Sequence, residues 1–297
     1  MLKKLLITGG SGLLGQYLNL RTFEVFDTLT LFNNNPANCQ DFNSAKADIR
    51  NQNEIEKVFK EFQPQFVVHS AALTNPVIPP DKTSRDYFET NVNATANIAK
   101  LCSEFGTKLI YISTDLVYAG YRGSMLKEDS KLIPASLYAE TKLMGEVKVR
   151  ELTENHLILR TALLYGIGLN HSSCHFQNMF TSLFSKMPVK LFTDQFRTPI
   201  SLIEASNIIT WLIDKEEANG TINLGGIERV SRYELGEILC DIAEFDKSLL
   251  IKSSMKDMSN LPQVEDVSLN TNKLSSLGIK QKSIEESIHN MLHGYLE

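Results

Sequence analysis

Tyr138 and Lys142 stand four residues apart, in the only Tyr-x-x-x-Lys segment of the chain. On a helix, side chains at this spacing lie on the same face. An ammonium group beside a phenol favours the phenolate and lowers the phenol pKa, so the pair could exchange a proton with a carbonyl oxygen. With nine tyrosines in the chain, such a pair arises by chance about half the time. The pair therefore needs support from its surroundings.

That support comes from two hydroxyls, Ser113 and Thr114, which directly follow the apolar run at residues 109–112. Ligands of open α/β sheets bind at the carboxyl ends of the strands. A hydroxyl at such an end can hydrogen-bond a carbonyl oxygen while a tyrosine protonates it, and we predict this role for Thr114. Capping of the local backbone is the alternative for both hydroxyls.

A glycine-rich loop occupies residues 8–15, between the first apolar run and the first helical pattern. Glycines at this spacing allow a tight turn, a close approach to a pyrophosphate and close packing of helix on strand. The N–H groups and the dipole of the helix N-terminus then favour the phosphates. The loop predicts dinucleotide binding, with these cofactor contacts: Gly9, Ser11, Gly12, Leu13 and Gly15.

The residues after the second apolar run should contact the adenosine of the cofactor. NAD enzymes often place a carboxylate there, on the ribose 2′-hydroxyl. Here the run ends in Asn33, with neither a carboxylate nor an arginine beside it. NAD and NADP therefore both stay open, with NADPH slightly favoured. Asp48 and Ile49 are expected beside the adenine, although Asp48 could equally be a helix-entry residue.

The elements that must position these residues alternate regularly over the first half of the chain. Strands are expected at residues 5–7, 29–32, 66–68, 109–112 and 157–159, and helices at residues 13–20, 53–62, 91–105 and 137–151. Short apolar runs separated by helices are typical of a parallel sheet with right-handed crossovers. The pattern predicts an α/β fold with a Rossmann-type doubly wound parallel sheet.

The alternation weakens after residue 166, where we predict a domain boundary. Residues 1–166 should form the dinucleotide-binding domain, and residues 167–297 mainly a smaller, interleaved substrate-binding lobe, with segments near 200–226 returning to the first domain. Ser231 with Glu234 predicts a capping box at a helix start. Near the C-terminus, an apolar helical stripe is expected to dock on the rest of the fold: Ile284, Ile288, Met291 and Leu292.

Composition narrows the classes of partner and compartment. The net charge is −5 and no run of Lys or Arg exceeds two residues, which disfavours nucleic acid and anionic membranes as partners. The four cysteines are scattered, which favours a reducing cytoplasm. The apolar run at residues 5–7 is too short for an export signal, and no stretch approaches the roughly 18 apolar residues that span a bilayer.

The histidines give little sign of chemistry. His171 and His175 are four residues apart, but the segment lacks a Glu beside a histidine, so no metal site is expected. His69 follows an apolar run and is expected to be a packed, hydrogen-bonded residue.

Taken together, the glycine loop, Thr114 and the Tyr138–Lys142 pair resemble the extended short-chain dehydrogenase/reductase superfamily. Within it, three further motifs resemble dTDP-4-dehydrorhamnose reductases and their sugar-nucleotide relatives: Ser113-Thr-Asp-Leu-Val-Tyr-x-Gly120, Leu159-Arg-Thr161 followed by Tyr165-Gly166, and Asp194-Gln-x-x-x-Pro199. The resemblance covers nearly the whole chain and is strongest up to Gly166.

The resemblance implies a nucleoside-diphosphate-sugar substrate in the smaller lobe. A hydride would pass from the nicotinamide C4 to a keto carbon while Tyr138 protonates the oxygen. Thr114 would orient the carbonyl, and Lys142 would also hold the nicotinamide ribose. By the same resemblance, Ala71 and Ala72 would line the cofactor, and Arg160 would lie near the helix that carries Tyr138.

Three departures limit the transfer. Related 4,6-dehydratases carry an acidic pair after the threonine, whereas here Asp115 is followed by Leu116, which disfavours dehydration. Arg197 stands two residues before Pro199, where the reductase relatives more often have small residues, and this suggests a different sugar or a different grip on an anion. The segment at residues 73–80 is rich in proline, which leaves substrate selection there open.

Three functions remain open at this point. The first is a NAD(P)H-dependent reductase of a keto-sugar nucleotide. The second is a nucleotide-sugar epimerase that retains its NAD(P), and the third is a non-catalytic, NADP-binding regulatory subunit, since a regulatory subunit of methionine adenosyltransferase resembles the same reductases. The sugar and the oligomeric state stay open, a homodimer being one possibility.

Overall fold

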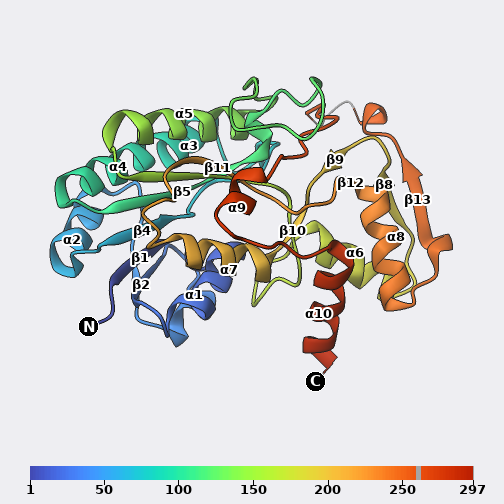
Figure 1. Cartoon of the computed structure of the whole chain (residues 1–297), viewed down its shortest axis with the longest axis horizontal. Coiled ribbons are helices and arrows are strands. Elements are labelled where there is room, and N and C mark those ends of the chain that lie inside the picture. Colours follow the sequence, from blue (N-terminus) through green and yellow to red (C-terminus); the bar gives the residue numbers. More distant parts are fainter. Residues whose placement is uncertain (259–261, 297) are drawn as a thin grey trace.

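The structure, a computed structural model, describes residues 1–258 and 262–296 and is organised around a seven-stranded parallel sheet (Figure 1). The strands lie in the order β11-β6-β5-β4-β1-β2-β3. Their bounds are β1 Lys4–Thr8, β2 Asp27–Phe32, β3 Ser44–Lys46, β4 Phe66–His69, β5 Lys108–Thr114, β6 His156–Thr161 and β11 Gly220–Leu224. Because β1 pairs with both β2 and β4, the order reverses there and opens a crevice at the carboxyl ends. The predicted Rossmann-type fold is confirmed.

Helices cover both faces of this sheet (Figure 1). One face carries α1 Leu13–Thr22, α7 Leu202–Leu212 and α9 Asn272–Ser276; the other carries α2 Gln52–Phe62, α3 Ser84–Phe88, α4 Ala94–Phe105 and α5 Leu137–Leu152. Successive strand side chains point to opposite faces. In β1, Leu5 and Ile7 therefore join the core beneath α1 and α7, while Leu6 joins the core beneath α2 and α4. Burial on both faces explains why the strands are apolar throughout.

Beside the large sheet lies a second group of elements with its own apolar core (Figure 1). It comprises α6 His175–Phe184, α8 Arg232–Ala243, α10 Ile284–Leu296 and three small strand pairs: β7 Leu164–Tyr165 with β10 Ile200–Ser201, β9 Phe196–Arg197 with β12 Val230–Ser231, and β8 Val189–Phe192 with β13 Leu250–Ser253. The predicted capping box at Ser231 and Glu234 is confirmed. Ile284, Ile288 and Met291 are buried in this core, and so confirm the predicted docking stripe.

The segment at residues 200–226 returns to the large sheet, since it supplies α7 and β11. The division into two domains at residue 166 stays a prediction.

The helix expected at residues 91–105 is present, and it extends back without a break through a π-helical turn to Ser84. α4 starts at Ala94, and Glu89–Asn93 form a π-helical turn after α3. Within this turn, the Asn91 side chain accepts from Leu73 N at 2.9 Å and donates to Leu73 O at 2.9 Å and Thr141 Oγ1 at 3.0 Å. These bonds join three segments at one point, and π-helical turns of this kind often occur at functional sites.

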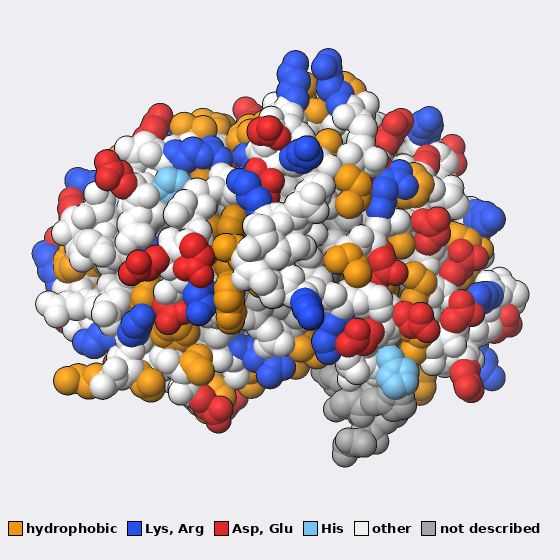
Figure 2. Space-filling model, in the orientation of Figure 1, with side chains coloured by type: hydrophobic (Ala, Val, Ile, Leu, Met, Phe, Trp, Pro, Cys, Tyr) orange, Lys and Arg blue, Asp and Glu red, His pale blue; other side chains and the backbone are white. Residues whose placement is uncertain are grey.

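The surface seen in Figure 2 carries Lys and Arg side chains interspersed with Asp and Glu. Within residues 1–258 and 262–296, the helices are all too short or too polar to cross a bilayer.

Candidate active site

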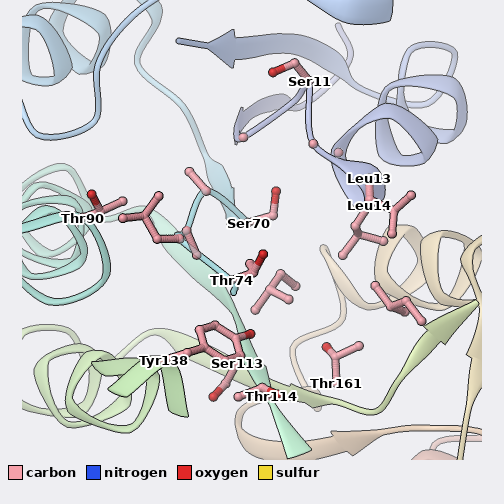
Figure 3. A pocket seen from close by; sticks show the side chains of 18 of the residues that line it. Ser11, Leu13, Leu14, Ser70, Thr74, Thr90, Ser113, Thr114, Tyr138 and Thr161 are labelled. Carbon is pink, nitrogen blue, oxygen red and sulfur yellow. The ribbon is translucent and has the colours of Figure 1, made fainter. Parts of the chain in front are cut away.

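A cavity of about 860 Å³ opens at the carboxyl ends of the sheet strands (Figure 3). Its lining includes all but one of the residues predicted from the sequence: Gly9, Ser11, Gly12, Leu13, Gly15, Asn33, Asp48, Ile49, Ala71, Ala72, Thr114 and Tyr138. Lys142 is the exception. It lies one turn after Tyr138 on α5 and is 2% exposed.

At one end of the cavity, the glycine loop is packed so closely that side chains at Gly9 and Gly15 would clash with neighbouring backbone. Gly9 has φ +73°, and a Cβ there would lie 2.7 Å from the backbone of Ala71. A Cβ on Gly15 would collide with the Gly9 carbonyl. No side chain caps α1 after Gly12, so the first N–H groups of this helix are left to water or a ligand. A cradle of this kind fits a pyrophosphate.

Asp48 lies between the cavity and the loop that leads into α2, and its contact with an adenine stays a prediction. It lines the cavity, and it also binds the following loop, where Arg50 Nη2 lies 2.6 Å from its Oδ2 and Arg50 N donates to its Oδ1 at 3.0 Å. The Arg50 hydrogen bonds hold the pKa of Asp48 below its usual value. Sequence reasoning missed Arg50, which lines the cavity as well.

Tyr138 and Thr114 come together on the cavity wall (Figure 3). Helix α5 begins after Ser136, whose hydroxyl accepts from Ala139 N at 3.2 Å, and this cap sets Tyr138 in the first turn. Burial raises the pKa of Tyr138 well above its ordinary value, and a hydrogen bond with Thr114 offsets part of this effect. Thr114 also accepts from Leu116 N at 3.2 Å, so it caps the local backbone and faces Tyr138 at once.

Lys142 is buried against a neighbouring ring rather than exposed to the cavity. Its Nζ lies 4.0 Å from the centroid of the Tyr111 ring, and burial lowers its pKa to about 7 while Glu146 raises it. The expected lowering of the Tyr138 pKa by Lys142 is therefore wrong for this structure, because burial dominates and the ammonium group lies against Tyr111 instead.

Arg160 lies against the helix that carries Tyr138, as the resemblance implied. It contacts Glu146 of α5 through Nη2–Oε2 at 2.8 Å and Nε–Oε1 at 3.0 Å, and both side chains are buried. Sequence reasoning missed Glu146. Its signal was its position four residues after Lys142, on the same helical face.

The far wall of the cavity is charged. Arg197 Nε lies 3.4 Å from Asp115 Oδ2, and Arg232 lines the cavity beside them. Arg232 donates from Nε to Gln195 Oε1 at 3.1 Å, whereas its buried Nη1 has no hydrogen-bond partner within the described part of the chain. Burial, together with Arg197, lowers the pKa of Arg232 to about 9. Its sequence signal was a cation in the first residue of a helix, where the dipole disfavours positive charge.

The histidines fall into two settings. His69 is buried, with Thr8 Oγ1 at 2.7 Å and Thr95 Oγ1 at 3.0 Å, which confirms its packing role. His175 lines the cavity, where burial and Arg232 lower its pKa to about 4. Within residues 1–258 and 262–296, no three His, Cys, Asp or Glu side chains gather as a metal site would require.

Comparison with known families decides what kind of protein this is. The model of the RmlD substrate binding domain matches residues 3–296. The chain belongs to this family. The resemblance predicted from the motifs is thereby confirmed at the level of the RmlD family and its extended short-chain dehydrogenase/reductase fold.

Two relatives of this RmlD-family chain have names that describe different functions, a transferase subunit and a probable reductase. Methionine adenosyltransferase 2 subunit beta from Pongo abelii is 28% identical over 294 residues, covering 95% of this chain and 84% of the relative. The probable low-salt glycan biosynthesis reductase Agl14 from Haloferax volcanii is 27% identical, covering 95% of each chain.

Solved structures agree on the fold. The dTDP-4-dehydrorhamnose reductase of Bacillus anthracis, solved with NADP, has a TM-score of 0.84 at 23% identity and covers 99% of this chain and 100% of its own. The ortholog from Clostridium acetobutylicum has a TM-score of 0.85 at 24% identity, with the same coverage. Both matches cover 99% of this chain, so they include the large sheet and the second group of elements alike.

Proposed function

We propose that this RmlD-family chain is a NAD(P)H-dependent reductase acting on the keto group of a nucleotide sugar. The observation that carries the proposal is the Tyr138–Thr114 hydroxyl pair on the wall of the same cavity that holds the glycine loop. A proton donor, a carbonyl-orienting hydroxyl and a phosphate cradle together meet the needs of carbonyl reduction.

The residues present fit a nicotinamide dinucleotide. The glycine cradle and the uncapped start of α1 suit its pyrophosphate, and similar folds have been solved with NADP or NAD. Ala71 and Ala72 would line the cofactor, Asn33, Asp48 and Ile49 would contact its adenosine end, and Lys142 would hold its nicotinamide ribose. When bound, the reduced cofactor supplies the hydride that the substrate carbon receives.

The chain itself would supply the proton and the orientation. Because burial raises the pKa of Tyr138, its hydroxyl is protonated at neutral pH and can donate to the carbonyl oxygen. Thr114 would fix that oxygen by a hydrogen bond. The carbon gains a hydride and the oxygen gains a proton, so the ketone becomes an alcohol, and Tyr138 recovers its proton from solvent.

The charged wall supports an anionic substrate. Two guanidinium groups, on Arg197 and Arg232, line this wall beside the Asp115 carboxylate, while Asp266 near Arg197 already pairs with Arg229. The excess positive charge suits the diphosphate of a nucleotide sugar. Leu116 stands where the related dehydratases have a second acid, which favours reduction over dehydration.

The similarity to methionine adenosyltransferase 2 subunit beta favours a second candidate, a non-catalytic regulatory subunit. One experiment separates the candidates: NADPH and NADH oxidation is followed by absorbance with a panel of 4-keto nucleotide sugars, for wild type and Tyr138→Phe. The reductase proposal predicts steady oxidation and a loss of about 10²–10⁴-fold in kcat for Tyr138→Phe. Tyr121→Phe, at an exposed tyrosine outside the cavity lining, is the matched control.

The epimerase and the regulatory subunit each predict a different result in this assay. Product without net cofactor oxidation would identify an epimerase. Cofactor binding without turnover of any sugar, with the cellular role kept in Tyr138→Phe, would identify a regulatory subunit. A cytoplasmic location, favoured by the scattered cysteines, and a homodimer remain part of the proposal to be tested.

A further inference from the structure

Helix α5 carries three functional side chains at intervals of four residues: Tyr138, Lys142 and Glu146. Glu146 is fully buried within the helix–sheet interface. A buried carboxylate is costly unless it is paired and hydrogen-bonded, so its partners indicate what it does.

Those partners come from two strands and from its own helix. Ser113 Oγ donates to Glu146 Oε1 at 2.6 Å, and Arg160 of β6 binds both carboxylate oxygens. Arg150, one turn further along α5, donates to Oε2 at 2.8 Å. Since Ser113 directly precedes Thr114, the Glu146 carboxylate fixes the end of β5 against the helix that carries Tyr138.

The neighbouring residue brings the helix close enough for this contact. A Cβ on Gly145 would collide with the Tyr111 hydroxyl and lie 2.9 Å from the Asn91 carbonyl. Only glycine therefore allows α5 to lie this near to β5 and to the π-helical turn.

Glu146 also acts on Lys142, one turn before it. The ammonium group is surrounded by neutral groups from other elements: the Tyr111 ring of β5 at 4.0 Å and His69 of β4, whose pKa burial lowers to about 3. Tyr138, one turn earlier, is neutral because its pKa is raised. Burial alone would raise the pKa of Glu146, but the contacts with Arg160, Ser113 and Arg150 lower it by more. The net pKa lies below the usual value, so Glu146 stays charged.

We infer that Glu146 is a positioning residue of the proposed reaction, which fixes Thr114 against Tyr138 and favours the protonated form of Lys142 inside the fold. The inference rests on the proposed function for its catalytic meaning. Its electrostatic part concerns the chain alone and can be tested without turnover.

The test is a direct titration of Lys142 by NMR in protein labelled with ε-¹³C-lysine, with the signal assigned by its loss in Lys142→Met. Removing the negative charge in Glu146→Gln should move the Lys142 midpoint down by about one pH unit. Removing a nearby cation in Arg150→Ala should move the Lys142 midpoint up by a few tenths of a pH unit, about the effect expected of a half-exposed charge. Equal midpoints in all three proteins would overturn the inference, since a purely structural role shifts neither.

A second variant separates positioning from charge and does not disturb the buried ion pair. Ser113→Ala removes the hydrogen bond between β5 and Glu146 but leaves the charges unchanged. We expect about a 10-fold lower kcat with little change in KM or in the Lys142 midpoint. An unchanged kcat would show that Glu146 does not position Thr114. If wild type turns over no sugar, the proposed function fails, while the NMR titration still decides the effect of Glu146 on Lys142.

Discussion

The two buried arginine sites of the molecule differ in how well their charges are matched. Behind α5, Arg160 binds Glu146 through Nε and Nη2 and also donates to Tyr118 Oη and Glu128 O, each at 2.8 Å. These contacts outweigh burial and raise the pKa of Arg160. This site is complete without a ligand.

On the cavity wall the balance is reversed. Arg197 Nε lies 3.4 Å from Asp115 Oδ2, Arg232 lines the cavity beside them, and burial lowers the pKa of both arginines. Asp115 Oδ2 and Arg232 Nη1 are buried without a hydrogen bond within the described residues. Buried polar groups are normally satisfied, and each exception needs an explanation. Behind α5, each buried charge has an opposite charge as its partner, and the pair stabilises the fold. In the cavity, the arginines lack such partners, and this favours the binding of an anion.

The largest expected effect tests the matched site. Arg160→Leu leaves the Glu146 charge buried without its main partner, and should lower the free energy of unfolding by about 3–5 kcal/mol. Urea unfolding followed by circular dichroism measures it. Arg150→Leu, which removes the half-exposed partner, should cost less than about 1 kcal/mol. Equal losses of unfolding free energy in the two variants would show that the Arg160–Glu146 pair stabilises the fold no more than the Arg150–Glu146 pair does.

The next effect tests the unmatched site. Arg232→Leu removes a buried cation that lacks a full set of partners, so the free energy of unfolding should not fall, while substrate KM should rise by about 10–100-fold, as for a lost charged hydrogen bond. Steady-state kinetics and thermal melting measure the two quantities. Arg122→Leu, at an exposed arginine outside the cavity lining, is the control. A destabilised Arg232→Leu with normal KM would make this wall structural.

The smallest effect is a difference in pH dependence between the two carboxylates. The pKa of Glu146 is lowered, so its stabilising contribution is present above its unfolded pKa and is lost as the pH falls through the folded one. The pKa of Asp115 is raised by burial, so its protonation favours the folded state as the pH falls.

Urea unfolding from pH 7 towards pH 3.5 can separate these two slopes. Wild type should lose stability relative to Glu146→Gln and gain it relative to Asp115→Asn, each by about 1 kcal/mol. Two slopes of the same sign would contradict the contrast between the sites.

Local patterns predicted the sheet and the cofactor end of the cavity, because strand burial, helix periodicity and the glycine loop are written in neighbouring residues. Tyr138 and Thr114 were found because each stands at a recognisable point of an element. Glu146 and Arg232 were missed because their partners, Ser113 and Arg160 for the first and Gln195 for the second, are distant in the sequence. Arg50 was missed because no motif includes it, although its partner Asp48 is only two residues away. Asn91 was also missed, because a π-helical turn arises from tertiary hydrogen bonds and leaves no period in the sequence.

The Asn91 amide has a mechanical consequence for the rim of the cavity. It holds Leu73 by two hydrogen bonds and Thr141 of α5 by a third. Leu73 is the first residue of the proline-rich segment at residues 73–80. Through Asn91, the start of this segment is therefore fixed to α5, the helix that carries Tyr138. Tyr87 Oη holds the segment again at the Asn75 carbonyl, at 2.7 Å. Any movement of the segment over a ligand must therefore hinge after Asn75, and the cavity-lining residues Ala71 and Ala72 stay on the fixed side of that hinge.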